Sequence, residues 1–244
     1  HWLEQQPWFN GDLGMWGQSY VGYVQWALAA KAPERLRAMV PGITSARLPK
    51  TTFRQGALSM DTLYRWIFKL DLMDRRGWLS KIKGLVRVLP RLEDRMLENA
   101  FWHFPLWDAD EQIVQHPVAF YREWMAHPDG QDAYWQVVDH SPALGEIDAQ
   151  VHLVSGWFDI FLGSLLQDYQ DLVSSGRQPY LTIGPWYHLN ASAMAETLRQ
   201  GLIWFDSVLK GKEGRLRRSP VRIYVMAANA GEWRDLETWP PATQ

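Results

Sequence analysis

The chain has 244 residues, of which 47% are hydrophobic, and a formal net charge of −2. This length suits one large domain or one and a half, and a charge so close to zero gives no reason to expect nucleic acid or an anionic membrane as a partner. The sequence has no apolar run of about 18 residues, so it predicts no transmembrane helix, and it has no cysteine, which excludes disulfides, thiol catalysis and thiolate metal sites and agrees with a reducing cytoplasm.

The first part of the chain predicts a β–α–β unit over residues 11–42. Residues 13–16 form a short apolar strand, and Tyr20 to Ala30 form an apolar helix that is buried on most faces. Leu36 to Val40 then form the next strand. Such a unit is the core of a parallel sheet, so we expect an α/β fold.

The pattern changes between about Leu58 and Glu123, where strand-like alternation is absent. Apolar residues recur there at helical spacing, and prolines separate the helices. The apolar residues are Leu63, Trp66, Ile67, Leu70 and Met73, then Leu79, Ile82, Leu85, Val86 and Leu89; the prolines are Pro90, Pro105 and Pro117. We therefore expect a helical insert between two parts of one sheet.

The sheet pattern resumes at Val151. A helix is predicted over 161–175, a strand over 180–184 and a second helix from about Ala195 to Leu209. Residues 221–226 alternate like a half-exposed strand, and we expect this strand to begin a further unit.

The first strand and the first helix meet at the sequence Gly17-Gln18-Ser19-Tyr20-Val21-Gly22. A strand, a sharp turn and a helix with serine at the apex lift the serine hydroxyl clear of the sheet. The two glycines leave room where the helix passes close to the strand, and N–H groups at the helix N-terminus can stabilise a developing oxyanion. Ser19 is thus a candidate nucleophile, with a simple helix N-cap as the alternative role.

Two later strands end in glycine and are followed by a polar residue. Asp159 follows the first of them and His188 follows the second. Active sites of open α/β sheets form at the carboxyl ends of the strands, and hydrolases with a nucleophile elbow order their triad as Ser, Asp and His. Ser19, Asp159 and His188 are therefore the candidate triad.

Several residues compete for these roles. Asp159 could instead cap the helix that begins near Phe161, and Asp168 and Asp171 are rival acids that lie within a helical pattern. The rival histidines have no Gly-Pro turn at a strand end; they are His1, His103, His116, His127, His140 and His152.

The chain resembles the CocE/NonD serine hydrolases, the family that includes cocaine esterase, X-Pro dipeptidyl-peptidases and α-amino acid ester hydrolases. The matching residues run through nearly the whole chain in family order. They are Gln6-Pro7-Trp8, Asn10-Gly11, Gly14-Met15, Gly17, Ser19-Tyr20, Gly22, Gly56-Ala57-Leu58-Ser59, Tyr134-Trp135, Ser141-Pro142, Gly156-Trp157-Phe158-Asp159, Gly184-Pro185-Trp186, His188, Leu209-Lys210-Gly211, Pro220-Val221-Arg222, Glu232-Trp233-Arg234-Asp235 and Trp239-Pro240.

The resemblance implies an α/β-hydrolase fold with a partial parallel sheet, an inserted helical cap and the start of a C-terminal jelly-roll β domain. The corresponding boundaries are 1–45 for the core with the elbow, 46–145 for the cap, 146–212 for the continued core, and 213–244 for a linker and the first strand of the β-sandwich. The family's upstream strands, which carry a second oxyanion donor, have no counterpart here. The chain thus resembles an internal portion of a longer hydrolase.

The resemblance also implies roles for individual residues. Ser19 would be the nucleophile, Asp159 the orienting acid and His188 the general base, while the backbone N–H of Tyr20 would be an oxyanion donor. Trp66 corresponds to a cap aromatic that family members often place over the substrate. Trp157 and Phe161 flank Asp159, so they are candidates for the acyl pocket, with core packing as the alternative.

These observations predict a serine esterase or amidase that cleaves small acyl esters through an acyl-enzyme, without a metal or other cofactor. An X-Pro dipeptidyl-peptidase is the alternative enzyme, and a catalytically inert fragment or interaction module is the alternative of another class. The expected partner is a small ester or peptide substrate, and a homo-oligomer is possible because an unpaired sheet edge at 13–16 would attract a second chain.

Overall fold

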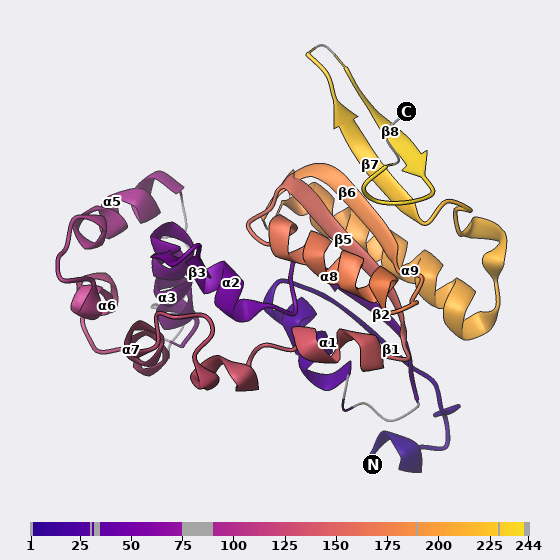
Figure 1. Ribbon diagram of the computed structural model, residues 1–244, viewed down its shortest axis with the longest axis horizontal. Coiled ribbons are helices and arrows are strands. Elements are labelled where there is room, and N and C mark those ends of the chain that lie inside the picture. The colour runs from indigo at the N-terminus through magenta and orange to yellow at the C-terminus, as the bar shows by residue number, and fades with distance from the viewer. Residues whose placement is uncertain are drawn as a thin grey trace. The chain divides into compact units, whose positions relative to one another are not determined.

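The computed structural model forms two compact units, His1–Leu48 with Val137–Gln244 and, separately, Pro49–Gln136 (Figure 1). The second unit lies within residues 46–145, the boundaries predicted for the helical cap. The residues that the structure describes are 2–29, 31, 35–74, 90–188, 190–228 and 230–241. His1 and the predicted helical residues Leu79, Ile82, Leu85, Val86 and Leu89 lie outside these ranges. None of the described helices is long and apolar enough to cross a membrane.

The first unit is built on a six-stranded sheet with the order β1-β2-β5-β6-β7-β8. The strands are β1 (Leu13–Gln18), β2 (Leu36–Gly42), β5 (Gln150–Phe158), β6 (Tyr180–Tyr187), β7 (Val221–Met226) and β8 (Gly231–Leu236). Neighbouring strands from β1 to β7 are parallel, and β8 is antiparallel to β7. The α/β fold is therefore confirmed, and β1 lies at an edge of the described sheet.

Helices cover both faces of this sheet (Figure 1). Trp26 of α1 (Tyr20–Ala29) and Leu165 of α8 (Leu162–Ser174) share a buried cluster with Met39 of β2. Trp204 of α9 (Ala191–Lys210) lies in a second cluster with Val40, the next residue of β2. Because successive strand residues point to opposite faces, α1 and α8 pack on one face and α9 packs on the other. The short 3₁₀ helices of this unit are η1 (Leu3–Gln5), η4 (Ser141–Glu146) and η5 (Glu213–Arg215).

The second unit is mainly helical. Its elements are α2 (Leu48–Thr52), β3 (Phe53–Arg54), β4 (Ala57–Leu58), α3 (Met60–Asp74), α5 (Pro90–Phe101), η2 (Leu106–Asp108), α6 (Ala109–Val114), α7 (Ala119–Ala126) and η3 (Ala133–Val137). Tyr64 and Ile67 of α3 are buried in one cluster with Leu97 of α5 and Tyr121 of α7. This helix-on-helix core agrees with the helical spacing in the sequence. Trp66 lies on α3 and is half-buried.

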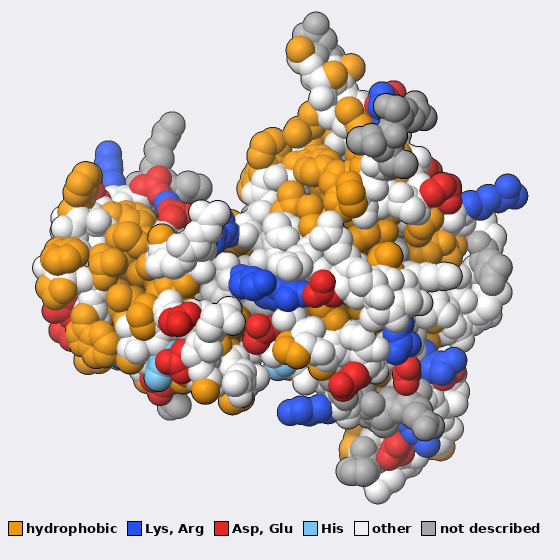
Figure 2. Space-filling model, viewed as in Figure 1, with side chains coloured by type: hydrophobic (Ala, Val, Ile, Leu, Met, Phe, Trp, Pro, Cys, Tyr) orange, Lys and Arg blue, Asp and Glu red, His pale blue; other side chains and the backbone are white. Residues whose placement is uncertain are grey.

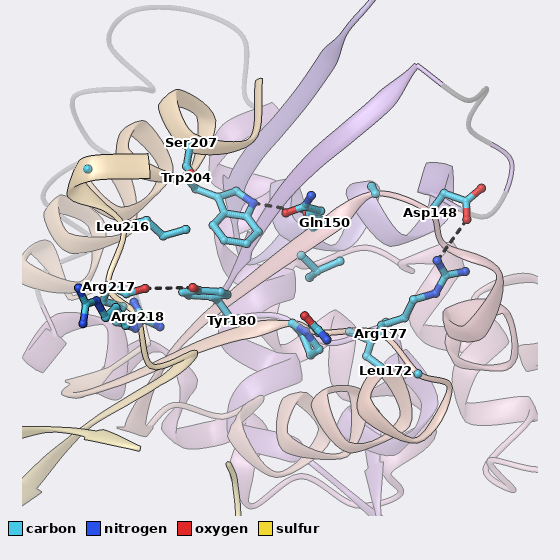
Figure 3. A pocket seen from close by; sticks show the side chains of 16 residues that line it. Asp148, Gln150, Leu172, Arg177, Tyr180, Trp204, Ser207, Leu216, Arg217 and Arg218 are labelled. Atoms are coloured by element: carbon cyan, nitrogen blue, oxygen red, sulfur yellow. Dashed lines mark hydrogen bonds and ion pairs between the residues drawn. The ribbon is translucent and has the colours of Figure 1, made fainter. Parts of the chain in front are cut away.

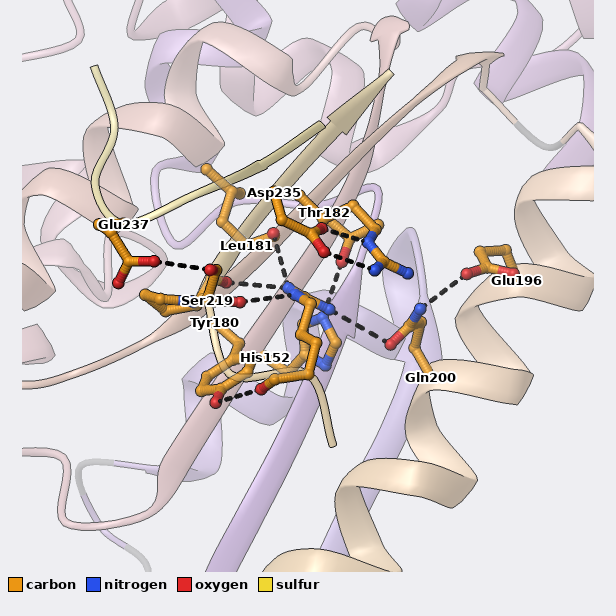
Figure 4. Close-up of polar contacts among 12 residues, drawn as sticks. His152, Tyr180, Leu181, Thr182, Glu196, Gln200, Ser219, Asp235 and Glu237 are labelled. Atoms are coloured by element: carbon orange, nitrogen blue, oxygen red, sulfur yellow. Dashed lines mark hydrogen bonds and ion pairs between the residues drawn. The ribbon is translucent and has the colours of Figure 1, made fainter. Parts of the chain in front are cut away.

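The strand at 221–226 continues the main sheet, so the predicted start of a jelly-roll domain is not confirmed. Val221 pairs with Leu181 of β6, and its side chain is buried in the sheet's own core. Arg217 holds the two strand starts together, because its Nη2 donates to the carbonyl oxygens of Leu181 and Pro220 at 2.8 Å each (Figure 4). The alternating pattern correctly predicts a half-buried strand but does not specify which sheet it joins.

Hydrophobic side chains reach the surface of both units on the face drawn in Figure 2. Large exposed ones include Trp102 and Phe104 in the helical unit and Leu202 on α9. Together with the edge position of β1, they supply surfaces on which a second chain could pack. Self-association stays a prediction.

Gly156 of β5 allows a close approach between two strands. A Cβ at this position would lie 2.2 Å from the carbonyl oxygen of Trp186 on β6, a backbone atom that cannot rotate away. Gly156→Ala is therefore expected to destabilise the fold by about 1–3 kcal/mol or more. Urea unfolding followed by tryptophan fluorescence measures the change.

Gly163 of α8 provides the matched control, because a Cβ there would meet no atom within 4 Å. Gly163→Ala is expected to leave stability unchanged or to raise it by up to about 1 kcal/mol, since alanine favours a helix. Equal unfolding midpoints for the two variants would contradict the packing described for Gly156.

Candidate active site

Ser19 occupies a strained turn between β1 and α1. Its φ angle is +53°, a backbone region that residues other than glycine rarely adopt. The turn is held from both sides, since the Ser19 N–H donates to the carbonyl oxygen of Gly42 at 2.9 Å and the Ser19 carbonyl accepts from the Tyr23 N–H at 2.8 Å. The strand–turn–helix geometry expected from the sequence is thus present around Ser19.

The glycines on either side of the turn lie where side chains would collide. A Cβ at Gly17 would come within 2.4 Å of Val21 Cγ1, and one at Gly22 within 2.7 Å of Thr44 Cγ2. The helix therefore passes close to the strand, as the spacing of these glycines predicts.

Ser19, His188 and Asp159, here called the polar triad, form one hydrogen-bonded series. Ser19 Oγ lies 3.0 Å from His188 Nε2, and His188 Nδ1 lies 2.7 Å from Asp159 Oδ2. The Asp159 side chain is fully buried, whereas that of His188 is 21% exposed. Asp159 Oδ1 also accepts the N–H of Phe161 at 2.8 Å, which fixes the carboxylate. A hydroxyl, an imidazole and a carboxylate at these distances have the geometry of an activated nucleophile.

The sheet explains why these three side chains meet. β1, β5 and β6 run parallel, so their carboxyl ends lie at the same edge. Ser19 directly follows β1, Asp159 follows β5 and His188 follows β6. Tyr20, the predicted oxyanion donor, is the first residue of α1, so its backbone N–H lies at the positive end of that helix.

The aromatic residues of the predicted acyl pocket have different surroundings. The Phe161 ring lies 5.5 Å from the His188 ring. Trp157 has the contacts of a core residue, since its Nε1 donates to the carbonyl oxygen of Tyr224 at 2.6 Å and its ring packs against Trp239. Trp66 belongs to the other unit, and its role over the substrate stays a prediction.

Two exposed aromatic residues next to triad members in the sequence were not identified by the sequence analysis. Phe158 and Tyr187 are register partners across β5 and β6, and they are 60% and 61% exposed. Each directly precedes a triad member, Asp159 or His188. The sequence could have indicated them, because each is an aromatic residue next to a polar residue at a strand end. Their exposure at this edge of the sheet makes both residues candidates for substrate contact.

The rival acids Asp168 and Asp171 bind elsewhere. Asp168 Oδ2 accepts from Ser45 Oγ at 2.7 Å and from the Ala46 N–H at 2.8 Å. Arg47 pairs with both aspartates. These contacts tie the segment after β2 to α8, which gives both carboxylates a structural function separate from His188.

The rival histidines also have partners away from Ser19. In the helical unit, His103 pairs with Asp108, His116 with Asp71 and His127 with Asp132. In the sheet unit, the His140 ring lies 5.2 Å from the Tyr23 ring in a tilted arrangement.

His152 is completely buried on β5, and its Nε2 lies 2.9 Å from Thr182 Oγ1. Burial lowers its pKa well below the usual value, and the charges of Arg217 and Arg199 lower it further. The unfolded chain therefore takes up a proton near pH 6.5 that the folded chain does not, so stability falls as the pH drops below that value. We expect a loss of about 1.4 kcal/mol between pH 7.5 and pH 5.5.

His152→Phe tests this expectation, because phenylalanine retains a ring against Tyr180 and Trp204 but cannot titrate. Urea unfolding at both pH values should give a smaller pH dependence for the variant, whatever its absolute stability. An unchanged pH dependence would show that another group is responsible.

A cavity of about 830 Å³ lies at the opposite ends of the strands (Figure 3). Gln150 and Tyr180, the first residues of β5 and β6, line it together with Arg177, Arg218 and Trp204. The polar triad follows the carboxyl ends of these strands. This cavity is therefore separate from the site around Ser19.

Comparisons of the sequence with known proteins identify a hydrolase family and related esterases. The sequence profile of the X-Pro dipeptidyl-peptidase (S15) family matches residues 1–190. A cocaine esterase of Rhodococcus sp. is 27% identical over 98% of this chain and 44% of its own length, and a putative serine esterase of Mycobacterium bovis is 23% identical over the same shares. The chain thus spans about 44% of the length of these curated relatives.

Solved structures share the fold. An aminopeptidase from a marine sediment Thaumarchaeota archaeon superimposes with a TM-score of 0.66 at 19% identity, covering 99% of this chain and 41% of the other. A CocE/NonD family hydrolase from Staphylococcus aureus gives 0.64 at 17% identity, covering 99% and 37%. An α-amino acid ester hydrolase gives 0.66 at 17% identity, covering 98% and 40%.

Proposed function

Because the chain belongs to the X-Pro dipeptidyl-peptidase (S15) family, we propose that the protein is a serine hydrolase that cleaves small acyl esters or amides through an acyl-enzyme. The observation that carries the proposal is the hydrogen-bonded series of the polar triad, with distances of 3.0 Å and 2.7 Å. The strained φ angle of Ser19 supports it independently, since strain of this kind clusters at active sites.

The proposed reaction begins when Ser19 Oγ attacks the substrate carbonyl carbon and His188 Nε2 takes the hydroxyl proton. The carbonyl oxygen becomes an oxyanion, which the N–H of Tyr20 at the start of α1 would stabilise. His188 then gives its proton to the leaving alcohol or amine as the bond to the acyl carbon breaks. Water, deprotonated by His188, hydrolyses the acyl-enzyme and restores Ser19.

Asp159 has two functions in this mechanism. Its carboxylate accepts the Nδ1–H of His188, which leaves Nε2 free to act as the base. It also stabilises the imidazolium that forms when Ser19 loses its proton. The hydrogen bond from Phe161 N–H to Asp159 Oδ1 holds the carboxylate in this orientation.

Two substrate classes are consistent with the family. The curated relatives bear the names of esterases, which favours esters, whereas the family profile is named for X-Pro dipeptidyl-peptidases. The second class needs a site for a free N-terminal amine. No feature of the sequence assigns such a site.

Two chromogenic substrates separate these classes when the whole protein is assayed. We expect p-nitrophenyl butyrate to be hydrolysed with a higher kcat/KM than Gly-Pro-p-nitroanilide. The reverse preference would establish the peptidase, and hydrolysis of neither substrate would favour the inert or interaction module. Activity that survives Ser19→Ala would come from another source.

A further inference from the structure

Thr197 of α9 joins the two segments that carry Ser19 and His188. We infer that Thr197 is a positioning residue, which fixes the distance between Ser19 Oγ and His188 Nε2 by holding α9 against the strand that precedes the nucleophile. The inference rests on the proposed function of the polar triad and adds to it a residue that touches neither substrate nor triad.

On the nucleophile side, Thr197 binds two side chains of β1. Gln18 Nε2 donates to Thr197 Oγ1 at 2.8 Å, and Trp16 Nε1 donates to the Thr197 carbonyl oxygen at 3.0 Å. Gln18 is the residue directly before Ser19. A displacement of α9 would therefore be transmitted to the turn that presents the nucleophile.

On the base side, Thr197 is connected to the start of α9, which follows His188 closely. Asn190 caps this helix, since its Oδ1 accepts the N–H groups of Ser192 and Ala193 at 2.9 and 3.3 Å. Thr197 Oγ1 donates to the carbonyl oxygen of Ala193 at 2.7 Å. The helix start that closely follows His188 in the chain is thus tied to the same hydroxyl that accepts the hydrogen bond from Gln18.

The surroundings leave Thr197 little freedom. Its side chain is completely buried, and its Cγ2 would lie only 2.9 Å from a Cβ at Gly42. The carbonyl oxygen of Gly42 accepts the Ser19 N–H, so Thr197 packs on the residue that holds the nucleophile turn. Its hydroxyl donates to the carbonyl oxygen of Ala193 and accepts from Gln18, so its one donor and one of its two acceptor positions are used in a buried site.

Removal of the Thr197 hydroxyl should therefore lower the rate of catalysis. Thr197→Val keeps the shape of the side chain but leaves the part-buried Gln18 amide without this partner, and an unpaired donor away from water favours rearrangement. A shift of about 1 Å between nucleophile and base costs about 10²-fold in rate. We expect kcat to fall about 10- to 100-fold with KM unchanged.

The experiment compares Thr197→Val with three further variants and one control. Thr197→Ser retains the hydroxyl and should stay within about threefold of the wild type. Gln18→Leu removes the same hydrogen bond from the β1 side, so its kcat should fall as far as that of Thr197→Val. The kcat of the double variant should fall no further than that of either single variant, because both substitutions remove one contact. Arg199→Gln is the control, since Arg199 lies on α9 and pairs with Glu196 of the same helix.

The rate at which a fluorophosphonate probe labels Ser19 is measured for each variant, together with kcat, KM and the folded fraction by circular dichroism. Wild-type labelling rates in Thr197→Val, equal losses in Thr197→Ser and Thr197→Val, or losses that only follow the folded fraction would overturn the inference while the proposed function stands. A wild-type protein that the probe does not label would overturn the proposed function and the inference with it.

Discussion

Ser19→Ala is expected to lower kcat for ester hydrolysis by about 10⁴- to 10⁶-fold. The substitution removes the only atom of the polar triad that can form the acyl-enzyme, whereas Tyr20 and the rest of the turn remain. Alanine at φ +53° keeps a strained backbone, so stability should change little. Steady-state hydrolysis of p-nitrophenyl butyrate by the whole protein measures the loss.

Ser174→Ala is the matched control, because Ser174 is exposed at the end of α8. Its kcat should equal that of the wild type. A Ser19→Ala protein that folds normally and retains more than about a tenth of the wild-type kcat would contradict the assignment of Ser19 as nucleophile.

Asp159→Asn is expected to lower kcat by about 10⁴-fold. Asparagine keeps the shape of the side chain but can donate a hydrogen bond to His188 Nδ1, which favours the tautomer with its proton on Nε2. That tautomer cannot accept the proton of Ser19. Steady-state hydrolysis of p-nitrophenyl butyrate by the whole protein measures the loss.

Asp168→Asn separates the two aspartates. Asp168 bonds with Ser45, Ala46 and Arg47, so its substitution should lower stability and leave the kcat of the folded protein close to that of the wild type. If Asp159→Asn leaves kcat unchanged and Asp168→Asn abolishes it, Asp159 is not the acid.

The parts of the fold that the sequence predicts are those set by local pattern. The β–α–β unit, the turn at Ser19 and the strand ends before Asp159 and His188 are each encoded in one continuous stretch of the chain. Parallel pairing then brings these ends together at one edge. Membership of the family, inferred from motifs spread along the chain, is confirmed by the match over residues 1–190.

Contacts between distant segments could not be predicted in this way. Gln18 and Thr197 are 179 residues apart, and neither has a motif that points to the other. The alternation at 221–226 shows that one face is buried but does not identify β6 as the neighbouring strand. Trp157 lies two residues before Asp159 in the sequence, yet its Nε1 donates to the carbonyl oxygen of Tyr224 and its ring packs against Trp239. Nothing in the local pattern points to these distant partners.

Labelling with a fluorophosphonate probe, followed by peptide mass spectrometry, tests the central claim most directly. The probe reacts only with a serine whose hydroxyl is activated by a neighbouring base. We predict one adduct, on the peptide containing Ser19, that is lost in His188→Ala while the folded fraction is retained. The absence of an adduct on folded protein, or an adduct on Ser19 that His188→Ala does not diminish, would contradict the proposed chemistry of Ser19, His188 and Asp159.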